Sequence, residues 1–429
     1  MACLSTPVKS DSAKKIITSG IAETIEKGHQ ILPGAHRFNH YVQLLKGRSV
    51  AVFANQTTVV GHTHLIDTLR KQGVVIRRIF SPEHGFRGTA DAGEKVGNYT
   101  DAQTGIPVVS LYGKKRELSK EDVDDVDVLI FDIQDVGVRF YTYISSLQEF
   151  MESAMRLNKP LLILDRPNPN GFYVDGPVLE KKYASFVGKQ PVPVVYGMTI
   201  GEYAYMLLKE NMLDVRTSYI SEVFIDPQPA TNIDLSKFSL TIVTCSGYTH
   251  HQKYVLPVRP SPNLPDMQSI YLYPSTCFFE GTVLSEGRGT SKPFQVFGHP
   301  SLPKNLFSFT PNPTEGAKQS KLYGQVCYGW DLSGTVEEVL QKTDNKVQLK
   351  WLIEAYRLFP EKDKFFILPK SGKMDDSFFN KLAGNNQLWQ QVKNGVKEED
   401  IRKSWEPALT AFKKVRKKYL LYEDFPSAR

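Results

Sequence analysis

The chain has 429 residues, a length that suits two domains better than one small module. Its composition, with 41% hydrophobic and 23% charged residues, is that of a globular protein and excludes collagen-like, coiled-coil and wholly disordered chains. The 53 Lys and Arg against 46 Asp and Glu give a net charge of +7, and the basic residues gather near the C-terminus, so no nucleic-acid-binding face is indicated. No apolar run approaches the roughly 18 residues of a membrane span, and we expect a soluble two-domain protein.

The four cysteines are too few for a disulfide scaffold, and they lack the CxxC spacing of a structural zinc site. We expect Cys245, Cys277 and Cys327 to be buried free thiols. Cys3 differs, because a polar stretch that resembles a tether follows it and Ala2-Cys3 is similar to a bacterial lipoprotein junction, although no apolar signal region precedes it. Two interpretations stay open for residues 1–20: a lipid anchor at Cys3 of a periplasmic or envelope-associated protein, or a plain flexible N-terminus.

In the first half of the chain, short apolar runs alternate with helical patterns. Continuous apolar runs predict strands over residues 49–54, 74–80, 108–111, 126–133 and 161–164. Apolar residues at helical spacing predict helices over about 63–72 and 143–157. This alternation of strands and helices predicts an α/β fold with a Rossmann-like open parallel sheet that is covered on both faces.

The second half follows a predicted helix over 199–211. It carries predicted strands over 240–245 and 323–330, helices over about 349–358 and 398–421, and a Pro-rich stretch from 257 to 313 that reads as irregular. We therefore divide the chain into a flexible segment (1–20), the Rossmann-like domain (21–235) and a C-terminal domain (236–429).

Polar clusters follow four of the predicted strands at the point where each strand ends. They are Asn55-Gln56-Thr57, Ser81-Pro82-Glu83-His84-Gly85, Gln134-Asp135-Val136-Gly137 and Asp165-Arg166-Pro167-Asn168-Pro169. Ligands of open α/β sheets bind at the carboxyl ends of the strands, so these loops predict one site. The candidate substrate-binding residues are Asn55, His84, Gln134, Asp135, Arg166 and Asn168. Neither a GxGxxG turn nor a GxxxxGK[ST] loop occurs, and no cofactor is expected.

Glu83 is the first candidate for a catalytic group. Pro82 before it and Gly85 after it predict a tight loop at a strand end, which can hold a carboxyl group in a cleft as a general acid must be held. The aromatic residues Phe140, Tyr141 and Tyr143 would make such a cleft apolar. The alternative is a structural Glu that accepts hydrogen bonds from backbone donors of the turn.

Two loops of the second half add further candidates. The run from Phe279 to Thr290 combines Glu280, Glu286 and Arg288 with three glycines, a composition that suits a backbone close to a ligand, and Arg288 can clamp a carboxylate or phosphate. The loop Arg259-Pro260-Ser261-Pro262-Asn263 offers Asn263 on a rigid backbone. The histidine groups, His62 with His64 and His250 with His251, have no recognised metal spacing, so no metal is expected.

Several of these motifs together resemble one bacterial family, the exo-acting β-N-acetylmuramidases (glycoside hydrolase family 171, formerly a domain of unknown function). The motifs are Ser81 to Gly88, Asp91-Ala92-Gly93-Glu94, Phe131 to Gly137, Asp165 to Pro169 and Ser285 to Thr290. The resemblance runs from about Gly47 to the C-terminal helix. It implies that a smaller α/β (α+β) C-terminal domain follows the Rossmann-like domain and closes a cleft between the two. It implies removal of a terminal N-acetylmuramic acid from the non-reducing end of peptidoglycan fragments, and the family's proposed catalytic Glu maps onto Glu83. The lactyl carboxylate of muramic acid gives Arg288 or Arg166 a physical role.

The second catalytic group stays open at the level of sequence. Glycosidases commonly use two carboxylates, and Glu286 is our first candidate beside Glu180, Asp132 and Glu94. The acetamido oxygen of the substrate is the alternative nucleophile. Two rival functions are a non-catalytic lipoprotein that binds cell-wall sugars and a metal-dependent hydrolase that uses His84 and Asp132.

Overall fold

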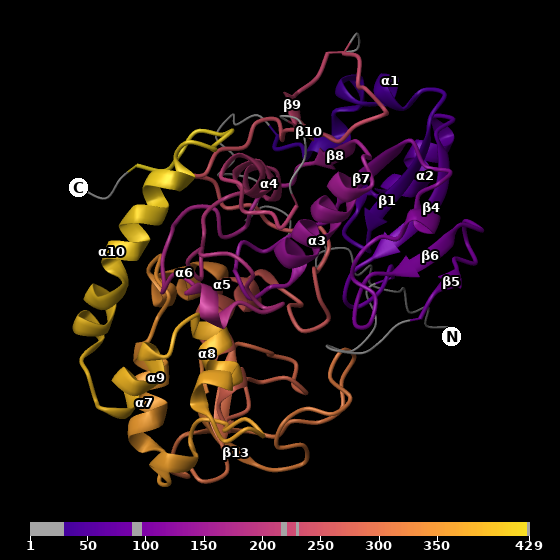
Figure 1. Ribbon diagram of the computed structural model, residues 1–429. Coiled ribbons are helices and arrows are strands. Elements are labelled where there is room, and N and C mark those ends of the chain that lie inside the picture. The colour runs from indigo at the N-terminus through magenta and orange to yellow at the C-terminus, as the bar shows by residue number, and fades with distance from the viewer. Residues whose placement is uncertain (1–29, 88–96, 216–220, 229–230, 427–429) are drawn as a thin grey trace, which may run out of the picture.

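An eight-stranded sheet forms the centre of the first half of the molecule (Figure 1). The structure is a computed structural model and describes residues 30–87, 97–215, 221–228 and 231–426. The strands lie side by side in the order β5 (Tyr99–Thr100), β6 (Pro107–Ser110), β4 (Val75–Ser81), β1 (Ser49–Ala54), β7 (Val128–Asp132), β8 (Leu161–Leu164), β10 (Ser239–Val243) and β9 (Glu222–Ile225). All neighbours pair in parallel except β5, which runs antiparallel to β6.

The six inner strands have the Rossmann order. If β1, β4, β6, β7, β8 and β10 are numbered along the chain, their spatial order is 3-2-1-4-5-6. The strand order reverses between β1 and β7, and ligands of such sheets bind in the crevice at the carboxyl ends near this point. The predicted Rossmann-like parallel sheet is therefore confirmed.

Alternate side chains of the strands point to two different cores. Phe53, Phe131 and Ile163 pack with α3 (Tyr143–Arg156) and α4 (Ile200–Lys209) on one face. Val52 and Ile130 pack on the other face with α1 (Val42–Leu45) and α2 (Leu65–Lys71). Because both faces are covered, the strands are apolar without interruption, which is why the sequence pattern located them well.

The start of α2 and the proposed domain edge differ from the expectation. Residues 63 and 64 are not helical but form β3 (Thr63–His64), which pairs with β2 (Val59–Val60), and the His64 side chain caps α2 by accepting from the Ile66 N–H. A border at residue 235 does not coincide with the edge of the sheet, because β10 follows it and is paired with β8.

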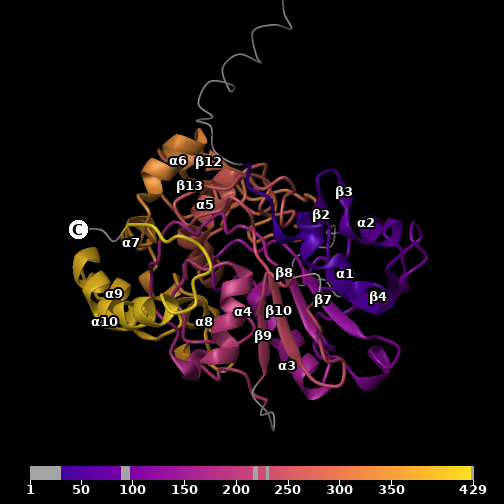
Figure 2. The same cartoon turned by 90° about the horizontal axis from the view of Figure 1, so that it is seen from above.

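The second half contains a small sheet and the remaining helices. The sheet has the order β11 (Val296–His299), β13 (Cys327–Asp331) and β12 (Phe307–Phe309), so the strand expected over 323–330 begins four residues later. The helices are α5 (Met267–Thr276), α6 (Val336–Thr343), α7 (Lys350–Leu358), α8 (Phe378–Ala383), α9 (Gln387–Lys393) and α10 (Glu398–Arg416). In Figures 1 and 2, α7, α9 and α10 lie far from the eight-stranded sheet, and α4 and α5 lie between these helices and the strands of that sheet.

Helix α5 lies inside the Pro-rich stretch that the sequence pattern assigned to irregular structure. Pro274 is within this helix and cannot donate to the carbonyl of Ile270, four residues earlier. The side-chain amide of Asn170 donates to that Ile270 carbonyl at 3.3 Å and to the Val136 carbonyl at 2.8 Å. A distant polar side chain therefore supplies the hydrogen bond that the proline removes.

The chain after α10 returns to the carboxyl edge of the sheet. Arg416 forms a two-bond ion pair with Asp424, and the Tyr422 hydroxyl donates to the buried Asp165 carboxylate at 2.5 Å. The first contact holds the segment after α10 against that helix, and the second fastens it to the Rossmann-like half. The helix expected over 398–421 accordingly ends at Arg416. No helix within residues 30–87, 97–215, 221–228 and 231–426 is long and apolar enough to span a bilayer.

Candidate active site

A pocket lies where the loops after β4 and β7 meet the second half of the chain. Five of the twelve residues that line it are Phe or Tyr, and one carboxyl group and one guanidinium are the charged groups among these described residues. The lining residues are Glu83, His84, Phe140, Tyr141, Thr142, Tyr143, Ser261, Asn263, Leu264, Tyr273, Arg288 and Phe294.

Two hydroxyl groups hold the Glu83 carboxyl group. The Tyr112 hydroxyl donates to Oε1 at 2.9 Å and the Thr142 hydroxyl donates to Oε2 at 3.1 Å. His84 and Gly85 follow with φ angles of 69° and 75°, in the left-handed region that non-glycine residues rarely adopt. This sharp turn ends β4 and places Glu83 in the pocket, and an unusual backbone at such a place is common in functional sites.

The His84 ring joins the first half of the chain to the loop around Ser261. Its Nε2 lies 3.2 Å from the Ser261 hydroxyl, and the imidazole is buried. Asn263, two residues further on, donates from its side-chain amide to the Gly316 carbonyl at 2.8 Å. The loop from Arg259 to Asn263, which the sequence predicted to be rigid, is thus held at Ser261 and at Asn263, and both of these residues line the pocket.

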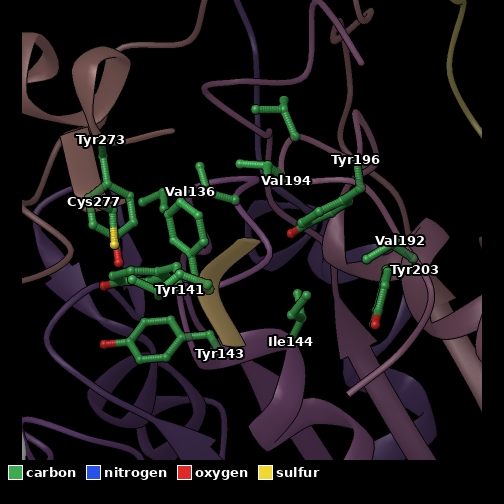
Figure 3. Packing of buried hydrophobic residues seen from close by; sticks show 14 of the residues in the cluster. Val136, Tyr141, Tyr143, Ile144, Val192, Val194, Tyr196, Tyr203, Tyr273 and Cys277 are labelled. Atoms are coloured by element: carbon green, nitrogen blue, oxygen red, sulfur yellow. The ribbon is translucent and has the colours of Figure 1, made fainter. Parts of the chain in front are cut away.

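A group of tyrosines forms one wall (Figure 3). Tyr141 and Tyr143 meet edge to face with ring centres 4.6 Å apart, and Tyr273 is perpendicular to Tyr141 at 6.2 Å, with the three hydroxyls on the same side of the group. The Pro260 carbonyl accepts from the Tyr141 and Tyr143 hydroxyls at 2.9 and 3.3 Å. Burial raises the pKa of each of the three phenols, so they stay protonated.

Arg288 is the cationic side chain among the described residues that line the pocket, and it forms a charged cluster with Glu280, Glu286 and Lys321. Its Nη2 donates to Glu280 at 2.7 Å and its Nε lies 3.4 Å from Glu286, while its guanidinium lies over the Phe294 ring at 5.1 Å. Lys321 Nζ approaches the second oxygen of Glu286 at 2.8 Å. Burial alone would raise the pKa of Glu286, but Lys321 and Arg288 outweigh it and lower that pKa, so Glu286 is ionised.

Six of the ten sequence-predicted site residues belong to this pocket or touch its wall. Glu83, His84, Asn263 and Arg288 line it. Asn55 lies behind it and donates to the Tyr143 hydroxyl at 2.8 Å, and Glu286 lies behind Arg288. Asn55 and Glu286 therefore position lining residues, and neither lines the pocket itself.

The other four predicted residues do not line the pocket but make hydrogen bonds within and between the loops at the sheet edge. They are Gln134, Asp135, Arg166 and Asn168. Arg166 is buried and makes a two-bond ion pair with Asp132, at 2.5 and 2.9 Å. Asn168 donates to the Met198 carbonyl at 2.8 Å, and Gln134 donates to the Pro167 carbonyl at 2.7 Å. Asp135 accepts from the Gly137 N–H at 2.6 Å and from the Tyr196 hydroxyl, and burial raises the pKa of Asp135 to about 6.

The alternatives for a second carboxylate are spread through the molecule. Asp132 is fully buried against Arg166. Glu180 is exposed beside Gly384, whose carbonyl accepts from the Glu180 N–H at 2.8 Å. Glu94, with Asp91 of the same motif, lies outside the described residues, as does Cys3. Within the described ranges, no three His, Cys, Asp or Glu side chains gather as metal ligands.

Tyr112, Thr142, Ser261 and Tyr273 belong to the site but were not among the predicted site residues. Tyr112 follows the end of β6, so its signal in the sequence is a polar residue after a short predicted strand. Tyr273 has no such signal, because it lies on α5 in the stretch read as irregular.

Two family profiles together match most of the chain. "Exo-beta-N-acetylmuramidase NamZ, N-terminal" matches residues 50–268 and the corresponding C-terminal profile matches residues 271–422. The chain belongs to the exo-β-N-acetylmuramidase family. It is therefore a glycoside hydrolase, as the resemblance of its motifs implied.

Individual relatives agree with this membership. The chain is 37% identical over 402 residues to the peptidoglycan β-N-acetylmuramidase NamZ of Bacillus subtilis, a match that covers 89% of each chain. Crystal structures of two proteins of Bacteroides fragilis, described as members of the DUF1343 family, have the same fold. One has a TM-score of 0.78 at 39% identity and covers 92% of this chain and 100% of that one, and the other has 0.70 at 27%, covering 92% and 99%.

Proposed function

We propose that this chain removes the terminal N-acetylmuramic acid from the non-reducing end of peptidoglycan fragments, with Glu83 as the general acid. The observation that supports this role is that Glu83 is the one carboxyl group among the described residues lining an aromatic pocket, and that two hydroxyls fix both of its oxygens. A general acid has to be held at a fixed place next to the departing oxygen.

Hydrolysis requires that the bond between C1 of the terminal sugar and the glycosidic oxygen breaks. Glu83 gives its proton to that oxygen as the bond breaks, and the next sugar leaves with a new hydroxyl group. Water supplies the hydroxyl that C1 retains and returns a proton to Glu83. The products are free N-acetylmuramic acid and a fragment shortened by one sugar.

Arg288 distinguishes the muramic acid from the glucosamine of the same polymer. The two sugars differ by the lactyl ether, which adds a carboxylate, and a guanidinium binds a carboxylate through charge-assisted hydrogen bonds. Both arginines are paired with carboxylates, but Arg288 lines the pocket and Arg166 does not. Of the two arginines considered from the sequence, Arg288 is the one in place to bind the substrate.

The test uses p-nitrophenyl β-N-acetylmuraminide and the matching β-N-acetylglucosaminide. The native chain should release p-nitrophenol from the muraminide and much less from the glucosaminide, and Glu83→Gln should lose the muraminide activity. Glu315→Gln is the matched control, because Glu315 is an exposed carboxylate paired with Arg259 outside the pocket. Turnover of neither substrate by the native chain would favour the non-catalytic sugar-binding protein, and full activity of Glu83→Gln would remove Glu83 from the mechanism.

We also propose an envelope location with a lipid anchor at Cys3, because the substrate lies outside the cytoplasmic membrane. Cells that carry the native gene and receive an alkyne-tagged fatty acid should label the protein, and Cys3→Ser should abolish the label. An unlabelled native protein would contradict the anchor without affecting the assignment of Glu83.

A further inference from the structure

An aromatic pair that is not part of the pocket lining adjoins Glu83. Of the two hydroxyls that bind Glu83, Thr142 belongs to the lining, and Tyr112 does not. The Tyr112 ring lies next to the Phe186 ring, with centres 6.0 Å apart and an angle of 54° between the planes. Both side chains are partly exposed.

The backbone presents Phe186 rigidly. Phe186 is at the tip of a tight turn in which Ser185 and Gly188 exchange two backbone hydrogen bonds, at 2.9 and 3.0 Å. Beneath the turn, a β-carbon added at Gly188 would meet the side chain of the fully buried Arg139 at 3.2 Å. Arg139 in turn donates to the carbonyls of Pro177, Val192 and Leu382. A fixed turn that exposes an aromatic ring is suited to binding.

A cation completes this surface. The Arg116 guanidinium lies 4.0 Å from the centre of the Phe186 ring, a cation–π contact. Its Nε is buried and has no hydrogen-bond partner among the described residues. Arg116 is also close enough to Tyr112 to oppose the upward shift that burial and Glu83 produce in the pKa of that phenol. The three side chains Tyr112, Phe186 and Arg116 thus form one patch, which we name the Phe186 platform.

We propose that the Phe186 platform is the subsite for the departing sugar, a 2-acetamido-hexopyranose of the glycan. This inference rests on the proposed function. A general acid must contact the glycosidic oxygen, which the terminal sugar and the next sugar share. With the terminal sugar in the pocket on the Thr142 side of Glu83, the next sugar lies on the Tyr112 side. Pyranose rings have flat C–H faces that pack against aromatic rings, and the sugar takes the face of Phe186 that Arg116 leaves open. Arg116 donates to the sugar's hydroxyl or acetamido oxygens.

The experiment compares two substrates that share the terminal sugar. One is the disaccharide N-acetylmuramyl-β-1,4-N-acetylglucosamine, and the other is methyl β-N-acetylmuraminide, whose leaving group is too small to reach the platform. The measured quantity is the ratio of kcat/KM for the disaccharide to kcat/KM for the methyl glycoside. We expect Phe186→Ala and Phe186→Leu to lower this ratio about tenfold, a change of about 1.4 kcal/mol, and Phe186→Trp to keep it within about threefold. Leu retains the apolar volume and loses only the flat face.

The controls separate the subsite from the proposed function. Phe307→Ala removes an exposed aromatic ring of β12, far along the chain from the platform, and should leave the ratio as in the native chain. A ratio that does not move in Phe186→Ala and Phe186→Leu, or equal losses on both substrates, would overturn the subsite while leaving the hydrolase intact. A native chain that cleaves neither substrate would contradict the proposed function itself. The subsite is then judged by disaccharide affinity alone, which Phe186→Ala should weaken about tenfold.

Discussion

Replacement of Glu286 by glutamine separates a positioning role from a catalytic one. Glu280, Glu286, Arg288 and Lys321 carry two negative and two positive charges, and the Glu286 side chain is 4% exposed. Glu286→Gln leaves one positive charge in excess at a largely buried place. Removing one partner of a buried ion pair costs about 3 kcal/mol or more, so we expect the free energy of unfolding to fall by about 3 kcal/mol.

The kinetic consequence follows from the place of Arg288. With one of its two carboxylate partners gone, Arg288 is held less firmly toward the substrate, so KM for the muraminide should rise about tenfold while kcat stays within about tenfold of the native value. Urea unfolding measures the first effect and steady-state kinetics the second. Glu315→Gln, at an exposed pair, should change the unfolding free energy by less than about 0.5 kcal/mol. A loss of kcat beyond about a thousandfold, with unchanged stability, would refute the positioning role and make Glu286 a participant in bond breaking.

Three further predictions concern the pocket and its support. Arg288→Met should lower kcat/KM for the β-muraminide about a hundredfold and hardly change the low activity on the β-glucosaminide, because only the muraminide carries the lactyl carboxylate. Tyr112→Phe should lower kcat about tenfold, because Glu83 loses the hydroxyl that donates to its Oε1. Burial raises the pKa of Asp135 from 3.8 to about 6, so the folded state binds more protons than the unfolded chain between these pH values and the unfolding free energy falls as pH rises through this window. Relative to the native chain, Asp135→Asn should therefore gain about 2.4 kcal/mol of stability between pH 4 and pH 7, measured by urea unfolding at both pH values. An equal difference at the two values would show that Asp135 does not hold its proton.

The sequence predicted the sheet well because buried parallel strands are continuously apolar. The runs 49–54 and 161–164 are the strands β1 and β8 to the residue. Helix α5 escaped prediction because its proline normally ends a helix, and the side chain that compensates for it, Asn170, is a hundred residues away in the sequence. Local patterns do not contain that information.

The sequence predicted candidate site residues at the carboxyl edge of the sheet, and the structure brings only some of them into the pocket. Glu83 and Arg288 line the pocket, as their residue types and turns suggested. Arg166 equally follows a strand, yet Asp132 at the end of the neighbouring strand captures its guanidinium. The residue types that bind a polar ligand also bind each other, and sequence order does not reveal which strand ends are neighbours in the sheet.

The most direct test of the account is the order in which products form from a defined tetrasaccharide. The substrate alternates N-acetylmuramic acid and N-acetylglucosamine and has the muramic acid at its non-reducing end, and mass spectrometry follows the products over time. The account predicts that free N-acetylmuramic acid and a trisaccharide appear first with the native chain, that Glu83→Gln forms neither, and that capping the non-reducing end with N-acetylglucosamine blocks the reaction. Disaccharides as the first products, or cleavage of the capped chain, would contradict it.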